Sequence, residues 1–335
     1  MGTGTIRPGS PRLRPAQLNL ALSLPPRPSV PDRRRRMRLP KRFPDWFPAA
    51  LAALILVVAT PASAVMLDLR RVPAGQPFYP GSTLIAEASP NTVYGFGTLD
   101  GILAAAAEVW SSAITDDYRV EVAYGWRTVG DANEVAEYRR QNLGFVNGAQ
   151  RVARANLMFD PTFSEWFLDA TPLDHSEYAQ YSERETWNGP IRVNTERRYG
   201  SPTTDDAQHL DLMTLALHEL GHALGFEYGV IADFLRDTGN PGGTAITVPA
   251  GLPAAGAVLP IEGPHLLEET TLMGAILNRG ERLLPTVADV VGAAAASRFT
   301  AVNPDLRPPR DTAVIPEPAA AALVGCLLVG LRRRD

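Results

Sequence analysis

Cysteine is almost absent from this sequence. The 335 residues contain a single one, Cys326 near the C-terminal end, so the residues before it hold no disulfide and no thiolate. Lysine is missing from residues 65–315, where 32 acidic residues face 18 arginines and give a net charge of −14. This acidic body repels phosphate groups, which argues against nucleic acid and anionic membrane surfaces as partners. The chain also lacks internal repeats and any apolar run of the ~20 residues that a membrane-spanning helix needs.

Apolar residues, in contrast, make up 45% of the chain, which is ample for the core of one or two domains. Composition divides the chain into three parts. Residues 1–64 are basic, residues 65–312 form an acidic body, and residues 313–335 form a short apolar tail with a basic end. We therefore expect one folded domain, over residues 65–312, between two segments of different character.

The first part has the features of an export signal. Residues 1–36 are rich in Pro and Arg without periodicity, which indicates a disordered or mis-assigned leader, with a basic binding arm as the alternative. Met37 is the expected true start. It is followed by basic residues, by the apolar run Phe47–Val58 and by Ala62-Ser63-Ala64. A charged segment, a short apolar segment and an A-x-A site make up a secretory signal peptide, so we expect cleavage after Ala64.

The tail carries a second targeting pattern. Pro316-Glu317-Pro318 precedes the mostly apolar segment Ala319–Leu331, and three arginines follow. This arrangement resembles the PEP-CTERM sorting signal of Gram-negative bacteria, with a plain C-terminal anchor as the alternative. The resemblance implies transient membrane anchoring and processing by an exosortase-like sorting enzyme. It places the protein in the periplasm, on the outer surface or in the extracellular matrix.

The most specific motif lies in residues 215–226, which read Leu-Ala-Leu-His-Glu-Leu-Gly-His-Ala-Leu-Gly-Phe. In a helix, His218 and His222 lie one turn apart on the same face, so their imidazoles converge on one point. Two neutral imidazoles suit Zn²⁺, and Glu219 beside them can act as the general base on metal-bound water. The apolar flanks bury the rest of the helix and favour a metal site over a solvated helix face.

With Gly225 three residues after His222, the stretch resembles the metzincin metallopeptidases, whose pattern H-E-x-x-H-x-x-G-x-x-H precedes a Met-turn. The last position of that pattern is Tyr228 here. Further along, His265 precedes Leu272-Met273-Gly274, which is similar to leishmanolysin-like metzincins, where an insertion separates the second and third histidines.

The resemblance implies His265 as the third metal ligand and Met273 in a turn beneath the metal, although Met273 could also simply fill the core. It also implies that the Gly-, Ala- and Pro-rich segment Gly243–Pro260 is an inserted loop. If His265 is a surface residue, then Tyr228, Glu262 or Glu269 completes the site. Tyr228 is also a candidate second donor to the oxyanion.

The remaining histidines have no partner at ligand spacing. His175 is expected in a solvated loop, and His209 is expected on the surface, because it precedes His218 by about two and a half helical turns.

Periodicity predicts a mixed fold. It indicates four helices and three strands: Leu99–Ile114, Ala207–Leu224, Ile231–Asp237 and Thr286–Arg298 as helices, and Arg119–Trp126, Arg154–Phe159 and Gly189–Asn194 as strands. Residues 203–206 offer N-cap side chains for the second helix. The resemblance implies an α+β, zincin-like fold with a small twisted sheet, an active-site helix and a mostly irregular or helical C-terminal subdomain. The sequence leaves open whether part of Val65–Pro90 is a propeptide.

These expectations define a secreted or surface-associated zinc endopeptidase. Glu219 would assist the attack of zinc-bound water on a peptide bond in a protein or peptide substrate. The alternative is a non-catalytic exported surface or biofilm-matrix protein with a zinc-stabilised fold. Glu219 argues against that alternative, because a structural zinc site has no need of this carboxylate.

Overall fold

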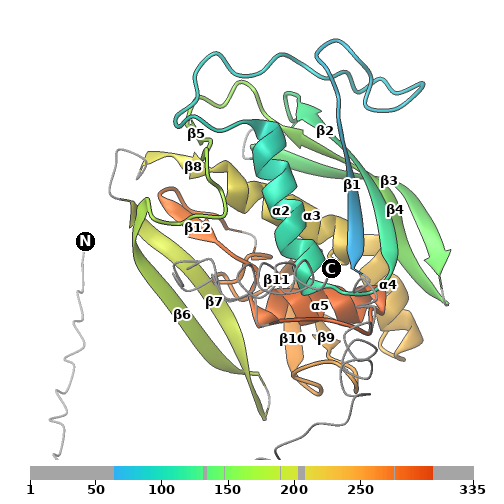
Figure 1. Cartoon of the computed structure of the whole chain (residues 1–335). Coiled ribbons are helices and arrows are strands. Elements are labelled where there is room, and N and C mark those ends of the chain that lie inside the picture. The colour runs from blue at the N-terminus through green and yellow to red at the C-terminus, as the bar shows by residue number, and fades with distance from the viewer. Residues whose placement is uncertain are drawn as a thin grey trace, which may run out of the picture. The chain divides into compact units, whose positions relative to one another are not determined.

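A computed structural model describes residues 64–130, 134–146, 148–188, 190–202, 208–274 and 276–304 (Figure 1). The predicted leader and signal peptide before Ala64, the sorting tail 313–335 and the candidate N-cap residues 203–206 lie outside the described residues. Within that part of the chain, no helix is long and apolar enough to cross a lipid bilayer.

A four-stranded sheet supports the domain. Its strands are β1 (Val65–Arg71), β2 (Tyr118–Trp126), β4 (Ala149–Phe159) and β3 (Ala136–Val146), in the order β1-β2-β4-β3. The first three run parallel, and β3 pairs antiparallel with β4 at the edge. The predicted strand 119–126 is confirmed, and the strand predicted at 154–159 begins earlier.

Residues 65–90 belong to this domain. Val65 is 1% exposed and forms the first pair of β1 with β2. Phe78, in the long connection after β1, is fully buried against Val72, Ala86 and Met158. Residues 65–90 thus supply a strand and core side chains to the domain.

Two helices pack together near the sheet. The helix α2 (Leu99–Ala113) begins at Thr98, whose hydroxyl caps the Gly101 N–H, and it matches the predicted helix within one residue. Its neighbour α3 is Leu212–Leu224, and every residue of α3 is buried. The two helices are joined where Trp110 Nε1 donates to the Leu217 carbonyl at 2.8 Å. The metal-motif helix is therefore held by tertiary contacts along its length.

The start of α3 differs from the prediction. The helix was expected from Ala207, but it begins at Leu212 with Asp211 as its N-cap, accepting from the Thr214 N–H at 3.0 Å. Just before it, β8 (Leu210–Asp211) pairs with β5 (Trp166–Phe167). Asp211 also binds the buried Arg282 guanidinium, a partner distant in sequence that local pattern could not reveal.

The C-terminal part contains more strands than expected. A long hairpin of β6 (Tyr178–Asn188) and β7 (Ile191–Pro202) pairs with β12 (Glu281–Leu283). A second small sheet joins β9 (Ala245–Thr247), β10 (Val258–Glu262) and β11 (His265–Leu266). The segment expected as an inserted loop, 243–260, thus contains β9 and the start of β10, which pair antiparallel.

The remaining predicted helices are present. They are α4 (Tyr228–Asp237), three residues longer than expected at its start, and α5 (Val287–Ser297). A capping box between Thr286 and Asp289 begins α5. With small sheets and four described helices, the architecture is α+β, as predicted.

Candidate metal centre

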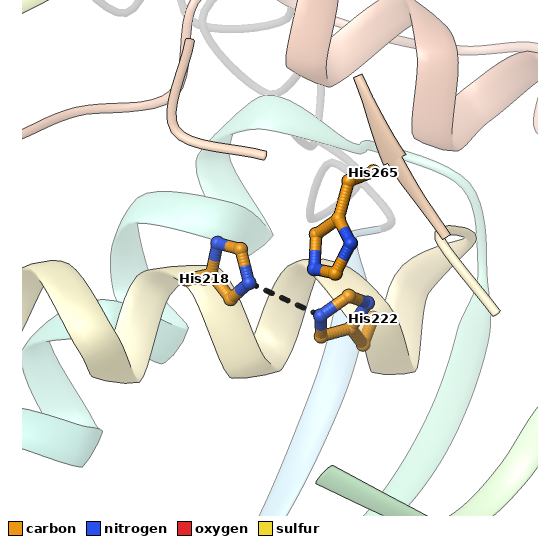
Figure 2. A group of neighbouring side chains, drawn as sticks. All are labelled: His218, His222 and His265. Atoms are coloured by element: carbon orange, nitrogen blue, oxygen red, sulfur yellow. Dashed lines mark hydrogen bonds between the residues drawn. The ribbon is translucent and has the colours of Figure 1, made fainter. Parts of the chain in front are cut away.

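The helix α3 presents two histidines to one point. His218 and His222 lie four residues apart on α3, and their side chains are buried, 6% and 7% exposed. Their Nε2 atoms approach to 3.1 Å (Figure 2). The sequence prediction that both imidazoles share one face of the helix is confirmed.

The third predicted histidine joins them from a separate strand. His265 begins β11, and its ring centroid lies 5.3 Å from that of His218 and 5.0 Å from that of His222. One ring nitrogen from each of the three lies within 4.8 Å of the others. Among the described residues, this is the only group of three or more His, Cys, Asp or Glu side chains with metal-ligand spacing.

Hydrogen bonds to backbone carbonyls orient the two helical imidazoles. His218 Nδ1 lies 2.8 Å from the Leu272 carbonyl oxygen, and His222 Nδ1 lies 2.6 Å from that of Phe226. A carbonyl only accepts, so both Nδ1 atoms carry the proton and both Nε2 atoms present lone pairs. Two lone pairs facing at 3.1 Å repel each other unless a cation lies between them. The donor set therefore fits a metal ion.

The environment keeps all three imidazoles neutral, which is the ligating form. Burial lowers the pKa of His218 to about 4, and the neighbouring His265 adds to the shift. Burial also lowers the pKa of His222, with His218 and His265 contributing, and that of His265. Protons therefore compete with a metal only in acid.

Glu219, the predicted general base, is buried next to His218 and is 5% exposed. Burial raises its pKa to about 8, and the nearby Glu134 and Glu137 carboxylates add to the effect. A buried carboxylate of this kind holds or releases a proton near neutral pH, as a general base requires. A cation at the histidines would favour its charged form.

The turn that contains Leu272 and Met273 makes hydrogen bonds with His218 and with the strand of His265. Leu272 and Met273 lie in the turn after β11, and their N–H groups donate to the two carboxylate oxygens of Asp289 at 3.1 and 2.9 Å. Met273 is fully buried, and its carbonyl accepts from the Leu266 N–H at 2.8 Å. The same turn thus carries the carbonyl that orients His218 and the bond that fixes the strand of His265.

The centre opens into a cavity of about 1230 Å³. One wall is the edge strand β3, with Glu137, Tyr138 and Arg140 among its lining residues. Apolar side chains, among them Phe163, Leu215 and Ile276, line other parts of the cavity. Its volume is large enough for several residues of an extended peptide.

The alternative third ligands lie at the periphery. Tyr228 lines the cavity but is 67% exposed, at the start of α4. Glu262 faces His265 in the β10–β11 pair, and both Glu262 and Glu269 are exposed. Neither carboxylate belongs to the group of converging ligand atoms. Geometry therefore favours His265 among the candidates.

The other two histidines lie outside this group, but neither is solvated as expected. His209 is 6% exposed and lies under the Tyr94 ring, so the surface placement was wrong. His175 is half-buried, with its ring 4.3 Å from that of Tyr199. Both aromatic partners are distant in sequence, which is why local pattern placed these histidines in solvent.

Sequence reasoning missed three residues of the site. The capping role of Asp289 could have been inferred, since Thr286 and Asp289 have capping-box spacing. The contact of Asp289 with the distant Leu272–Met273 turn could not. Glu227 caps α4 and accepts from Arg140 Nη1 at 2.6 Å, joining α4 to β3. Tyr138, on β3, has no sequence signal of its own.

Comparison of the chain with protein families, curated proteins and solved structures found no match.

Proposed function

We propose that this chain is an exported, zinc-dependent endopeptidase with a metzincin-like catalytic centre. The observation that carries the proposal is the convergence of His218, His222 and His265, which line a large cavity together with Glu219. Three histidines leave a coordination position open, which is typical of catalytic rather than structural zinc sites. No cysteine is present in the body to complete a structural site.

Bound at these histidines, zinc would polarise a carbonyl and lower the pKa of water toward ~7. The protein's own groups supply the rest of the chemistry. His218 and His222 are held as neutral ligands by the Leu272 and Phe226 carbonyls. The Glu219 carboxylate takes a proton from the attacking water and delivers it to the leaving amine.

The remaining parts of the proposal follow from sequence. The Met273 turn and the late His265 favour a zincin-like fold with leishmanolysin-like ligand spacing. The signal peptide and the PEP-CTERM-like tail favour export, membrane anchoring through the tail and processing by an exosortase-like enzyme. The substrate is then a protein or peptide outside the cytoplasm.

Cleavage of casein by the purified, zinc-loaded chain tests this function. Glu219→Gln should retain zinc and lose activity by about 10²- to 10⁴-fold, since it removes the general base. Glu108→Gln, on the exposed side of α2, is the matched control and should remain fully active. A chelator should abolish cleavage. A wild-type chain that binds zinc but cleaves no peptide would favour the non-catalytic surface or matrix protein.

A further inference from the structure

The edge strand β3 places a tyrosine beside the metal-binding histidines. Tyr138 lines the cavity, and its ring centroid lies 5.6 Å from that of His222. The strand is fixed against the end of α3 by the Arg140–Glu227 ion pair, because Glu227 follows the Phe226 carbonyl that orients His222. The contacts that fix the position of Tyr138 therefore lie next to the carbonyl that orients the His222 imidazole.

The Tyr138 hydroxyl is a buried donor without an acceptor. It has no hydrogen-bond partner in the described residues, and of the buried side-chain atoms that share this property it alone belongs to a residue lining the cavity. Two other tyrosines of the domain have hydrogen-bond partners: the Tyr118 hydroxyl donates to the Val152 carbonyl at 3.0 Å, and that of Tyr124 to Asp100 at 3.0 Å. An unpaired buried hydroxyl costs stability, and a ligand bound at the neighbouring histidines would supply the missing hydrogen-bond acceptor.

A tyrosine hydroxyl donates one hydrogen bond through its O–H group, and this is the contact that an oxygen carrying negative charge accepts.

We propose that the Tyr138 hydroxyl is the hydrogen-bond donor to an oxyanion bound at the His218–His222–His265 centre. This inference rests on the proposed function for the identity of that oxyanion, the oxygen of a peptide carbonyl under attack. A donor placed where negative charge develops stabilises the transition state more than the ground state. Tyr138, rather than the exposed Tyr228 expected from sequence, is then the second oxyanion donor.

Binding of acetohydroxamate to the zinc-loaded full-length chain tests this role independently of turnover. In Tyr138→Phe, calorimetry should show acetohydroxamate affinity reduced about tenfold, with zinc affinity unchanged. The melting temperature of the metal-free variant should be equal or higher, because an unpaired hydroxyl has been removed. Tyr118→Phe, the matched control, should melt lower, since it breaks an internal bond, and should bind acetohydroxamate as the wild type does. In peptide cleavage, Tyr138→Phe should lower kcat with little change in KM.

Unchanged acetohydroxamate affinity in Tyr138→Phe would overturn the assignment. A parallel loss of zinc affinity, or a fall in melting temperature like that of Tyr118→Phe, would also overturn it, since either indicates that the side chain only supports the fold or His222. A wild-type chain that binds zinc and acetohydroxamate but cleaves no peptide would refute the proposed function while the binding comparison still decides the role of Tyr138. Failure of the wild type to bind zinc would overturn both.

Discussion

Met273 fills the space that the missing side chain of Gly221 leaves on α3. A Cβ built on Gly221 would lie 2.3 Å from Met273 Sδ and 3.2 Å from Trp110 Cζ2. Because Gly221 lies between His218 and His222 in sequence, the turn that carries Met273 packs directly against the metal-motif helix. The contact explains why a glycine, which costs a helix about 1 kcal/mol relative to alanine, occurs here.

Gly221→Ala should therefore destabilise the protein by about 1–3 kcal/mol, as overpacking of a filled core does, despite the better helix propensity of alanine. Chemical denaturation measures the change. Gly200→Ala, where an added Cβ meets nothing within 4 Å, is the control. Adding Met273→Ala to Gly221→Ala should cost less than the sum of the single changes, because both alter the same contact. Strict additivity would contradict the packing explanation.

Asp289 should affect metal binding from a distance. Asp289→Ala removes the acceptor of the Leu272 and Met273 N–H groups as well as part of the α5 capping box. We expect a loss of stability of about 2–4 kcal/mol and weaker zinc binding, since buried donors are left unpaired and the turn that orients His218 loosens. Zinc competition and denaturation measure the two effects.

Thr286→Ala separates these contributions. It removes the cap hydroxyl, which costs about 1 kcal/mol, but leaves Asp289 to hold the turn. Its zinc affinity should equal that of the wild type. An equal loss of zinc affinity in both variants would show that helix stability alone, and not the turn, controls the centre.

The third ligand is tested by substitution. His265→Ala should weaken zinc binding by more than the roughly 10- to 100-fold that losing an outer hydrogen-bond partner of a ligand costs. Tyr228→Phe should leave zinc content unchanged, since its side chain is largely exposed at the cavity edge. Metal analysis after dialysis measures both, and retention of zinc by His265→Ala would refute the assignment.

A buried cluster around Arg282 should make stability depend on pH. Arg282 Nη1 lies 2.9 Å from Asp169 and 3.0 Å from Glu177, while Nη2 lies 2.9 Å from Asp211. Three carboxylates share one guanidinium. Burial and the hydrogen bond with Asp169 raise the pKa of Glu177 to about 8, so it holds a proton in the folded state.

The unfolded chain ionises Glu177 near its ordinary pKa, about 4.5. The stabilising contribution of the raised pKa is complete below that value and is lost as pH rises through about 8. Between pH 6.5 and 8, the wild type should lose about 1–2 kcal/mol that Glu177→Gln does not lose. Burial lowers the pKa of the adjacent His175 to about 4, so it stays neutral across that window.

Denaturation curves at several pH values measure this difference. Glu185→Gln, an exposed residue of β6 paired with Arg192, is the control and should follow the wild-type pH dependence. Parallel curves for the wild type and Glu177→Gln would show that Glu177 is ionised in the folded state.

The histidine motif was predictable because its geometry is local. A spacing of four residues on any helix brings His218 and His222 together, whatever the rest of the fold. The prediction of His265 as the third ligand required a family resemblance, since nothing near it in sequence indicates that β11 faces α3. The predicted start of α3 was wrong, because the observed start depends on the contact of Asp211 with Arg282, which is distant in sequence.

The missed strands have a different cause. The edge strand β3, the strand β6 and the part of β7 beyond the predicted strand 189–194 have polar, charged sequences without a clean apolar alternation. Their order comes from cross-strand pairing and from ion pairs, such as Arg184 with Glu196, between residues apart in sequence. Single-sequence periodicity detects burial and so misses strands whose stability comes from pairing.

Because His265 lies on β11 and not on α3, a metal bound at the three histidines would connect two segments that are distant in sequence. A metal held by His218, His222 and His265 would close a loop of more than forty residues in a domain that has no cysteine. Cross-linking distant segments restricts the unfolded chain, and binding to the folded state alone adds RT ln(1 + [Zn²⁺]/Kd) to stability. A bound metal would thus act as a cross-link that stabilises the fold, and a chelator should lower the melting temperature of the zinc-loaded protein together with its activity.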